Sequence, residues 1–446
     1  MQGLSEHERY KPYNSRTIRE TPYWNKLTPA LQEAMNVVAR VMPFRTNDYV
    51  LSTLIDWNNI PDDPIFRMTF PHKDMLLPDE YASLKQLIET DDAAAIKRRI
   101  EAIWLRMNPH PAGQLTHNGA LLEGKLLPGI QHKYRETVLF FPGAGQTCHA
   151  YCTFCFRWAQ FIGEEELKFN ARESQELVSY LRVHTEVTDV LITGGDPMIM
   201  NTRSLAAYLE PLLLLPHLNS IRIGTKSVAY WPQRFVSDKD APELLALFER
   251  IVAAGKHLSI MGHYNHPVEL RQDIARQAVE RIRATGATLR MQAPVIRHIN
   301  DNPGDWPALW TEGVRLGAVP YYMFVERDTG PSHYFALPLA RAFEIFQAAY
   351  RSVSGLARTV RGPSMSTFYG KILINGIDTV AGEKVFVLQF LQARNPLWVL
   401  RTFYACYDPQ ATWFDELRPA FGERSFFFQT DSLATPELIP VLLETA

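Results

Sequence analysis

Short apolar runs alternate with longer amphipathic stretches between residues 134 and 352, and this alternation is the main structural signal of the chain. The runs that predict strands are 137–141, 189–193, 220–224, 258–262, 288–293 and 319–325. The stretches that predict helices between and after them are 172–185, 203–215, 242–254, 270–285, 306–316 and 339–352. Six βα units in succession predict parallel strands with right-handed crossovers, in an open or a closed barrel.

The regions before residue 134 and after residue 352 have a different pattern of apolar and polar residues. Residues 29–41 and 93–107 carry apolar residues at helical spacing, and the Pro- and Gly-rich segment 109–131 is interpreted as a linker or an active-site cover. After residue 356 the pattern becomes strand-rich and aromatic, as in KILING, VFVLQFL and LWVLRTFY. Such a segment is typical of a cap or an oligomerisation element.

The sequence therefore predicts an α/β fold built around a partial parallel (β/α)6-type barrel. Its domains are expected to be a helical N-terminal region with linker at 1–130, the barrel core at 131–355, and a C-terminal cap or oligomerisation segment at 356–446.

Charge and composition narrow the classes of function. The 46 Lys and Arg residues nearly balance the 48 Asp and Glu residues, which argues against a nucleic-acid partner because phosphate binding needs a surplus of cations. The longest apolar stretch, 209–218, contains Glu210 and two prolines, so we expect no membrane span. The N-terminus lacks an apolar signal region and the chain has only 4 cysteines, so a reducing cytoplasm is the expected location.

Three of the cysteines form the strongest chemical motif. Cys148, Cys152 and Cys155 lie in CHAYCTFC, just after the first predicted strand of the βα array. Three thiolates at this spacing can ligate three irons of a [4Fe–4S] cubane and leave the fourth iron open. An open iron can chelate the amino and carboxylate groups of S-adenosylmethionine, whose reductive cleavage yields a 5′-deoxyadenosyl radical.

Other uses of the motif are weaker. A zinc site would need a fourth Cys or His nearby, and His149 is adjacent to Cys148, which makes joint tetrahedral ligation awkward. Cys406 is about 250 residues away, so we expect neither zinc nor a second cluster. An electron-transfer ferredoxin would normally supply four thiolates.

Longer strings of the sequence resemble a known family of enzymes. HKYRETVLFF, CTFCFRW, LITGGDP, PHLNSIRIGTKSVAYWPQRF, GHYNHP, MQAPVIRHIND and VPYYMFVERDTGPSHYF resemble the radical S-adenosylmethionine superfamily, and within it the lysine 2,3-aminomutase group. The N-terminal TLIDWNNIPDDPIF is similar to the helical entry region of that group. The resemblance implies a radical S-adenosylmethionine barrel, an anaerobic enzyme and a flavodoxin- or ferredoxin-type electron donor.

Several residues of this chain match functional positions of the aminomutase group. The resemblance assigns the turn Gly194, Gly195 and Asp196 to the methionine amino group of the cofactor, and Arg157 to its carboxylate. His263 and Gln292, each near the end of a predicted strand, match positions near the cofactor. The ordinary alternatives are a tight strand-to-helix turn, a surface arginine and two satisfied polar side chains.

Pyridoxal phosphate, which the aminomutases also use, stays an open question. Lys371 is in register with the lysine that forms their Schiff base, but PSMSTFYGK replaces the family's glycine run. Lys133 and Tyr134 match part of the phosphate-binding patch, whereas Thr137 stands where a further arginine is expected. The alternative for Lys371 is a solvated lysine beside a turn.

Two further departures concern the substrate. Arg327 and Arg361 occupy the positions of two aspartates that hold the side-chain ammonium of lysine in the family. Guanidinium groups would repel an ammonium and attract a carboxylate or phosphate. The alternatives are that Arg327 pairs with Glu326, Asp328 or Glu344, or that the alignment slips by one residue.

The expected function is hydrogen abstraction from a small anionic, amino-acid-like substrate, with 1,2-amino migration as one outcome. Elimination, decarboxylation, epimerisation or rearrangement without pyridoxal phosphate is the alternative enzymatic outcome. A non-enzymatic iron–sulfur protein is the alternative of a different class. The flanking regions also suggest a homo-oligomer.

Overall fold

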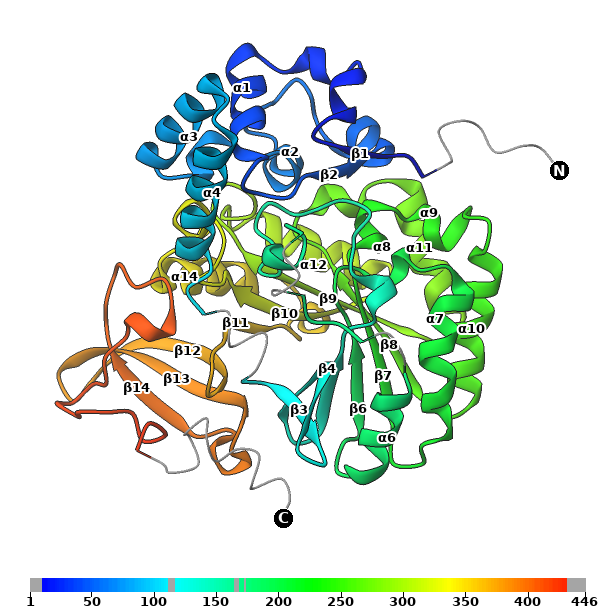
Figure 1. Cartoon of the computed structure of the whole chain (residues 1–446). Coiled ribbons are helices and arrows are strands. Elements are labelled where there is room, and N and C mark those ends of the chain that lie inside the picture. The colour runs from blue at the N-terminus through cyan, green and yellow to red at the C-terminus, as the bar shows by residue number, and fades with distance from the viewer. Residues whose placement is uncertain (1–9, 111–116, 164–167, 172–173, 431–446) are drawn as a thin grey trace.

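The computed structural model describes residues 10–110, 117–163, 168–171 and 174–430 (Figure 1). Its centre is a mixed sheet of 12 strands in the order β14-β13-β12-β11-β10-β9-β8-β7-β6-β5-β4-β3. Strands β5 to β11 pair in parallel, and the pairs at both ends of the sheet are antiparallel.

The predicted alternation of strands and helices is present, mostly within three residues at each strand boundary. The strands are β5 (Thr137–Phe140), β6 (Asp189–Ile192), β7 (Ser220–Thr225), β8 (His257–His263), β9 (Thr288–Val295) and β10 (Val319–Val325). The longer helices are α6 (Gln175–Val183), α7 (Thr202–Leu209), α10 (Ala241–Ala253), α11 (Asp273–Ala284), α12 (Asp305–Arg315) and α14 (Leu339–Arg351). Short helices α8 (Ser227–Tyr230), α9 (Gln233–Val236) and α13 (Ser332–Phe335) follow the ends of β7 and β10.

Alternation along the strands divides the sheet into an apolar and a polar face. In β7, Ile221 and Ile223 are fully buried, while Ser220 and Arg222 lie on the opposite face and are only partly buried. The helices cover the outer, apolar face in Figure 1, and that layer holds the main hydrophobic core. Because side chains alternate with a period of two, the polar residues point to the inner face.

The N-terminal region packs over the segment that carries the cysteines. It contains α1 (Pro29–Val38), α2 (Pro64–Thr69), α3 (Pro78–Thr90) and α4 (Ala93–Met107), with a small sheet of β1 (Pro12–Asn14) and β2 (Arg45–Asn47). The Tyr10 hydroxyl and the Asn47 amide both donate to the carbonyl oxygen of His149, at 3.0 and 3.2 Å. This region, at the top of Figure 1, therefore covers the carboxyl end of the parallel strands.

The segment 109–131, interpreted as a linker, is largely a hairpin. Strand β3 (Gly119–Leu122) pairs antiparallel with β4 (Lys125–Tyr134), which in turn pairs with β5. Residues 111–116 lie outside the described part of the chain.

The C-terminal strands extend the central sheet instead of forming a separate cap. Strand β11 (Arg361–Ser366) lies parallel to β10, and β12 (Gly370–Val380), β13 (Glu383–Ala393) and β14 (Thr402–Cys406) follow in antiparallel order. Their own core is aromatic and includes Phe390, Phe403 and Phe428.

The two ends of the sheet approach each other. Lys133 on β4 donates from Nζ to the carbonyl oxygen of Thr367, between β11 and β12. Arg394, just after β13, donates to the Asn118 side chain beside β3. Because these pairs join strands far apart in the strand order, the sheet must curl, and its polar inner face encloses a cavity. No helix among the described residues has both the length and the apolar character needed to cross a bilayer.

Candidate active site around the three cysteines

Cys148, Cys152 and Cys155 lie as free thiols in the loop that follows β5. Burial, followed by the charges of Asp196 and the other two thiols, raises the pKa of Cys148 well above its usual range. Burial also raises the pKa of Cys152 to about 11 and that of Cys155 to about 12. The thiols lie close enough to act on one another, and holding them as thiolates requires a positive centre such as a metal group.

Cys148, Cys152 and Cys155 lie in one loop, and three thiolates there could ligate three irons of a cubane.

The turn after β6 passes directly beside the cysteine loop. Gly194 has a φ of +151°, and a Cβ atom there would lie 2.3 Å from Nε2 of Gln146. A Cβ atom on Gly195 would lie 2.5 Å from the carbonyl oxygen of Thr147. Only glycine permits this approach without a shift, so the two glycines bring the turn against the residues that precede Cys148.

Asp196 has a structural task within this turn. Its carboxylate accepts from the Thr225 hydroxyl at 2.6 Å, from the Ser227 hydroxyl at 2.9 Å, and from the backbone N–H groups of Lys226 and Ser227, both at 2.9 Å. These hydrogen bonds lock the end of β7 to the end of β6. The Asp196 side chain is therefore engaged within the protein, while the two glycines pack against the cysteine loop.

Arg157 lies inside the same loop and is 6% exposed. One of its terminal nitrogens donates to Oε1 of Gln146 at 3.2 Å, and its guanidinium lies 4.2 Å from the centroid of the Phe141 ring. Its Nε is buried without a hydrogen-bond partner among the described residues. Burial lowers the pKa of Arg157 to about 10, although the group still carries its charge near neutral pH. The unpaired donor is a free position for an anionic ligand.

A buried ion pair, absent from the sequence predictions, borders the cysteines. Lys226 donates from Nζ to Glu269 at 2.7 Å and to Asn265 at 2.8 Å, and Glu269 is fully buried. The Lys226 ammonium also lies 4.5 Å from the centroid of the Tyr230 ring, whose hydroxyl is 3.7 Å from Sγ of Cys152. The sequence did not predict that Lys226 and Glu269 pair, because the two residues are 43 positions apart and only the fold brings the end of β7 to the turn after β8.

His263 and Gln292 are register partners on β8 and β9. Burial, followed by the Lys226 charge, lowers the pKa of His263 to about 3, so its imidazole is neutral. His263 is the last residue of β8, and Gln292 lies in the second half of β9, toward the side of the cysteine loop.

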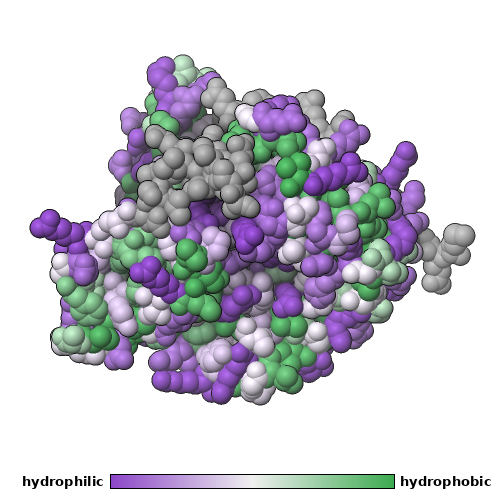
Figure 2. Space-filling model, turned by 90° about the horizontal axis from the view of Figure 1, so that it is seen from below, coloured by the Kyte–Doolittle hydropathy of each residue, from purple (hydrophilic) through white to green (hydrophobic). Residues whose placement is uncertain are grey.

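A cavity of about 410 Å³ lies on the inner face of the sheet. Its lining residues are Thr137, Asp189, Ser220, Arg222, His257, Ser259, Arg290, Tyr321, Tyr322, Arg361, Lys371 and Gln392. Many of them are first or third residues of parallel strands, so the cavity belongs to the amino-terminal half of the sheet. Figure 2 views the molecule from below and shows hydrophilic side chains around a hollow near the middle of that face.

Lys371, the candidate Schiff-base lysine, and Arg361, one of the two arginines expected to bind the substrate, both line this cavity. The Lys371 ammonium lies 4.0 Å from the Tyr322 ring centroid, and the Arg361 guanidinium lies 4.5 Å from the same centroid. Burial, followed by the charges of Arg222 and Arg361, lowers the pKa of Lys371 to about 7. A substantial fraction of Lys371 is therefore a neutral amine near neutral pH.

Arg327 is not among the residues that line this cavity. In the described part of the chain it forms no ion pair with Glu326, Asp328 or Glu344, and its Nε has no hydrogen-bond partner. Its guanidinium lies 5.4 Å from the Phe156 ring centroid, beside the cysteine loop. The two arginines at the family's aspartate positions thus lie in different surroundings.

A second cationic group surrounds Lys133 and Tyr134. Burial, followed by the charges of Arg394, Arg327 and Lys371, lowers the pKa of Lys133 well below its usual range. Burial raises the pKa of Tyr134 to about 12, while Arg394 and Arg327 act in the opposite direction. Lys371, which lines the cavity, is one of the charges that lower the Lys133 pKa.

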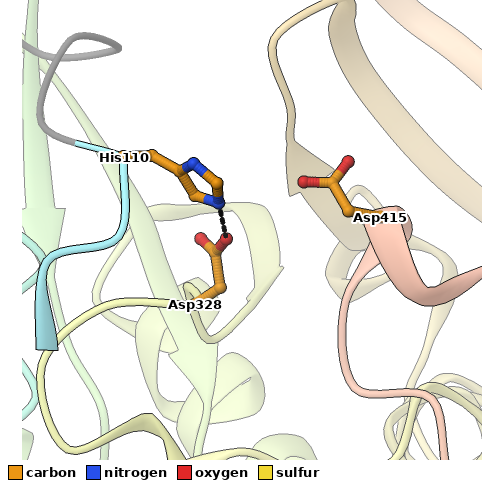
Figure 3. A group of neighbouring side chains, drawn as sticks. All are labelled: His110, Asp328 and Asp415. Atoms are coloured by element: carbon orange, nitrogen blue, oxygen red, sulfur yellow. Dashed lines mark ion pairs between the residues drawn. The ribbon is translucent and has the colours of Figure 1, made fainter. Parts of the chain in front are cut away.

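A separate polar group joins the three parts of the chain (Figure 3). His110 follows α4, Asp328 follows β10, and Asp415 lies in the C-terminal segment, with donor atoms within 4.8 Å of one another. His110 Nε2 is 3.5 Å from Asp328 Oδ2. Burial and the Asp328 charge raise the pKa of Asp415. The group is exposed for the most part and stands outside the cavity.

Comparison with known proteins gives a clear result. No protein-family model matches the chain. The chain is 34% identical over 389 residues to a protein of Aquifex aeolicus (strain VF5) that is provisionally named L-lysine 2,3-aminomutase, with 86% of this chain and 90% of the relative covered. The L-lysine 2,3-aminomutase of Haemophilus influenzae is 29% identical over 252 residues, with 55% and 70% covered. That of Escherichia coli (strain K12) is 28% identical over 248 residues, with 54% and 68% covered.

Among solved structures, SuiB of Streptococcus suis bound to the precursor peptide SuiA matches with a TM-score of 0.35 and 13% identity, covering 60% of this chain and 57% of SuiB. This likeness is too low to support a conclusion.

Proposed function

Because the chain belongs to the lysine 2,3-aminomutase family of radical S-adenosylmethionine enzymes, we propose that it rearranges a small anionic amino acid by radical chemistry. Membership implies a [4Fe–4S] cluster and S-adenosylmethionine, which together supply a 5′-deoxyadenosyl radical for hydrogen abstraction. Strands β5 to β10, which are parallel, and their helices would form the six-stranded partial barrel that the superfamily uses.

The residues around the loop after β5 would hold these groups. Cys148, Cys152 and Cys155 would ligate three irons and leave the fourth for the cofactor. The turn at Gly194 and the unpaired Nε of Arg157 would face the amino and carboxylate groups of its methionine moiety. A flavodoxin- or ferredoxin-type protein would donate the electron.

The charge of the inner cavity carries the proposal for an anionic substrate. Four cationic side chains and one carboxylate line it, and Arg361 stands where the resemblance places an acidic residue. An ammonium such as the lysine side chain would be repelled there, whereas a carboxylate would gain charge-assisted hydrogen bonds. The relatives are named for lysine, and the substrate proposed for this chain differs from lysine in charge.

Pyridoxal phosphate fits the residues around Lys371 in part. A lysine with a pKa of about 7 has a nucleophilic neutral form, and the cationic group of Lys133, Arg327 and Arg394 offers charge for a phosphate. When bound, the cofactor would stabilise the migrating amino group and permit 1,2-amino migration. Without it, the same radical would lead to elimination, decarboxylation, epimerisation or another rearrangement.

The test is anaerobic incubation of the reconstituted protein with dithionite, S-adenosylmethionine and a panel containing glutamate, aspartate and lysine. We expect 5′-deoxyadenosine formation that depends on an acidic panel member, with deuterium transferred from that compound. Formation dependent on lysine alone would refute the anionic substrate. A pyridoxyl label fixed on Lys371 by borohydride, located by peptide mass spectrometry, would support the aminomutase route. Failure of added pyridoxal phosphate to produce it would favour the other route.

A further inference from the structure

We propose that Arg290 and Arg361 together bind the distal carboxylate of a dicarboxylic amino acid about as long as glutamate. This inference rests on the proposed function and deepens it, because it identifies the residues that read the far end of the substrate. Arg290 carried no signal in the sequence, where it is one polar residue within a predicted strand.

Arg290 and Arg361 are available to bind a ligand, because the one carboxylate among the described residues that line the cavity is paired with another arginine. The guanidinium of Arg222 is already paired with Asp189, to which it donates from Nε at 2.9 Å and also from a terminal nitrogen. Asp189 further accepts from the Ser220 hydroxyl at 2.8 Å and the Thr137 hydroxyl at 3.1 Å, so its carboxylate is fully engaged. In the described part of the chain, neither Arg290 nor Arg361 forms an ion pair with a carboxylate.

Both free guanidinium groups converge on one aromatic side chain. Arg290 lies 5.1 Å and Arg361 lies 4.5 Å from the centroid of the Tyr321 ring. A register shift between Pro320 and Tyr322 in the pairing of β10 with β9 lets two consecutive tyrosines line the cavity. The aromatic surface orients the two planar donor forks, and such forks match a carboxylate bidentately.

The distance along β9 sets the length of the ligand. Arg290 and Gln292 are two residues apart on the same face of the strand, which corresponds to about 6.6 Å of rise. Gln292 pairs in register with His263 at the end of the strands where the cysteine loop lies. A distal carboxylate at Arg290 therefore places the other end of a five-carbon amino acid near the expected cofactor. A cavity of about 410 Å³ accommodates a molecule of this size.

Binding of glutarate, which has the carbon skeleton of glutamate without its amino group, tests the inference apart from catalysis. The protein is the anaerobically reconstituted holoenzyme, and the measurement is isothermal titration with glutarate, inorganic phosphate and 1,5-diaminopentane. We expect glutarate to bind, 1,5-diaminopentane not to bind, and Arg290→Gln and Arg361→Gln each to weaken glutarate at least tenfold. Arg290→Lys keeps the charge but loses the fork, and we expect an intermediate loss.

Matched controls make the result decisive. Arg203→Gln removes the same charge from the exposed side of α7, outside the cavity, and should leave glutarate affinity within twofold of wild type. Unchanged cluster absorbance and circular dichroism would show that each variant is folded. Glutarate affinity within twofold of wild type in both cavity variants would overturn the inference, as would selective binding of phosphate at the same arginines. Arginine-dependent glutarate binding without any 5′-deoxyadenosine would instead refute the proposed function alone.

Discussion

The ammonium group of Lys371 lies 4.0 Å from the centroid of the Tyr322 ring, so an aromatic face is its neighbour where a carboxylate would be the usual partner of a lysine. Arg222 and Arg361 add positive charge from the same cavity, and after burial they are the causes that lower the Lys371 pKa to about 7. The lysine is protonated below that pH and neutral above it. The arrangement supplies a nucleophilic amine without a dedicated base.

Reductive methylation of Lys371 should therefore depend on pH around neutrality. Raising the pH from 6 to 8 carries the group from mostly protonated to mostly neutral, and we expect about a tenfold increase in labelling rate, read by peptide mass spectrometry. Arg361→Gln removes a neighbouring cation, which raises the Lys371 pKa and reduces labelling at pH 7 severalfold. Arg203→Gln should change nothing. A labelling midpoint near pH 10 in the wild type would contradict the electrostatic argument.

Replacement of a cluster cysteine separates the motif from an ordinary thiol. Cys155→Ser should lose most of the bound iron and sulfide and reduce S-adenosylmethionine cleavage by more than a hundredfold, because one of three cluster ligands is gone. Cys406→Ser is the matched control: its sulfur lies on β14, 3.1 Å from the Pro419 carbonyl oxygen. Iron content and absorbance near 410 nm provide the measurement. Equal iron loss in both variants would argue against a three-cysteine site.

Glycine at position 195 is expected to be essential for the turn. In Gly195→Ala the added Cβ would meet the Thr147 backbone at 2.5 Å, and backbone cannot move away as a side chain can. We expect a loss of about 1–3 kcal/mol in unfolding free energy and weaker S-adenosylmethionine binding. The control is Gly376→Ala in β12, where the nearest atom is 4.0 Å away. Chemical denaturation and titration with S-adenosylmethionine would compare them, and equal behaviour would count against the close approach.

The order and type of the central elements could be predicted because each is defined by a local pattern. Strand β10 has the bounds 319–325 that its apolar run predicts, and α4 has those of the amphipathic stretch 93–107. The hairpin of β3 and β4 escaped prediction because its glycines and prolines indicated irregular chain. Pairing of β4 with β5 overrides that preference, and pairing between separate segments leaves no local pattern.

The site divides in the same way. The cysteines and the turn at Gly194 are contiguous motifs, so the spacing of the cysteines predicts a cluster and the family resemblance predicts the role of the turn. Arg222 and Arg290 are single polar residues within separate strands, and only sheet register brings them into one cavity. Placing Arg327 and Arg361 by sequence position suggested one shared pocket, whereas the cavity lining includes only Arg361. Side-chain direction at a strand end depends on tertiary packing that spacing does not encode.

The buried pair of Lys226 and Glu269 gives the sharpest prediction about stability beside the cluster. Lys226→Met would leave the fully buried Glu269 carboxylate without its 2.7 Å partner. Loss of one member of a buried pair costs about 3–5 kcal/mol, because the remaining charge stays desolvated. Anaerobic urea denaturation followed by tryptophan fluorescence would measure the change.

Two variants test whether that cost comes from the stranded charge. Lys97→Met removes a lysine that is 75% exposed and lies 3.6 Å from Glu101, and exposed pairs contribute only about 0–1 kcal/mol. The double variant Lys226→Met with Glu269→Gln removes the charge as well, so it should recover part of the loss. The backbone N–H groups of Asn265 at 2.5 Å and of His266 at 3.0 Å both donate to one oxygen of Glu269, and the amide oxygen of glutamine can accept both in its place. A double variant less stable than Lys226→Met alone would show that packing, and not the unpaired carboxylate, dominates at this position.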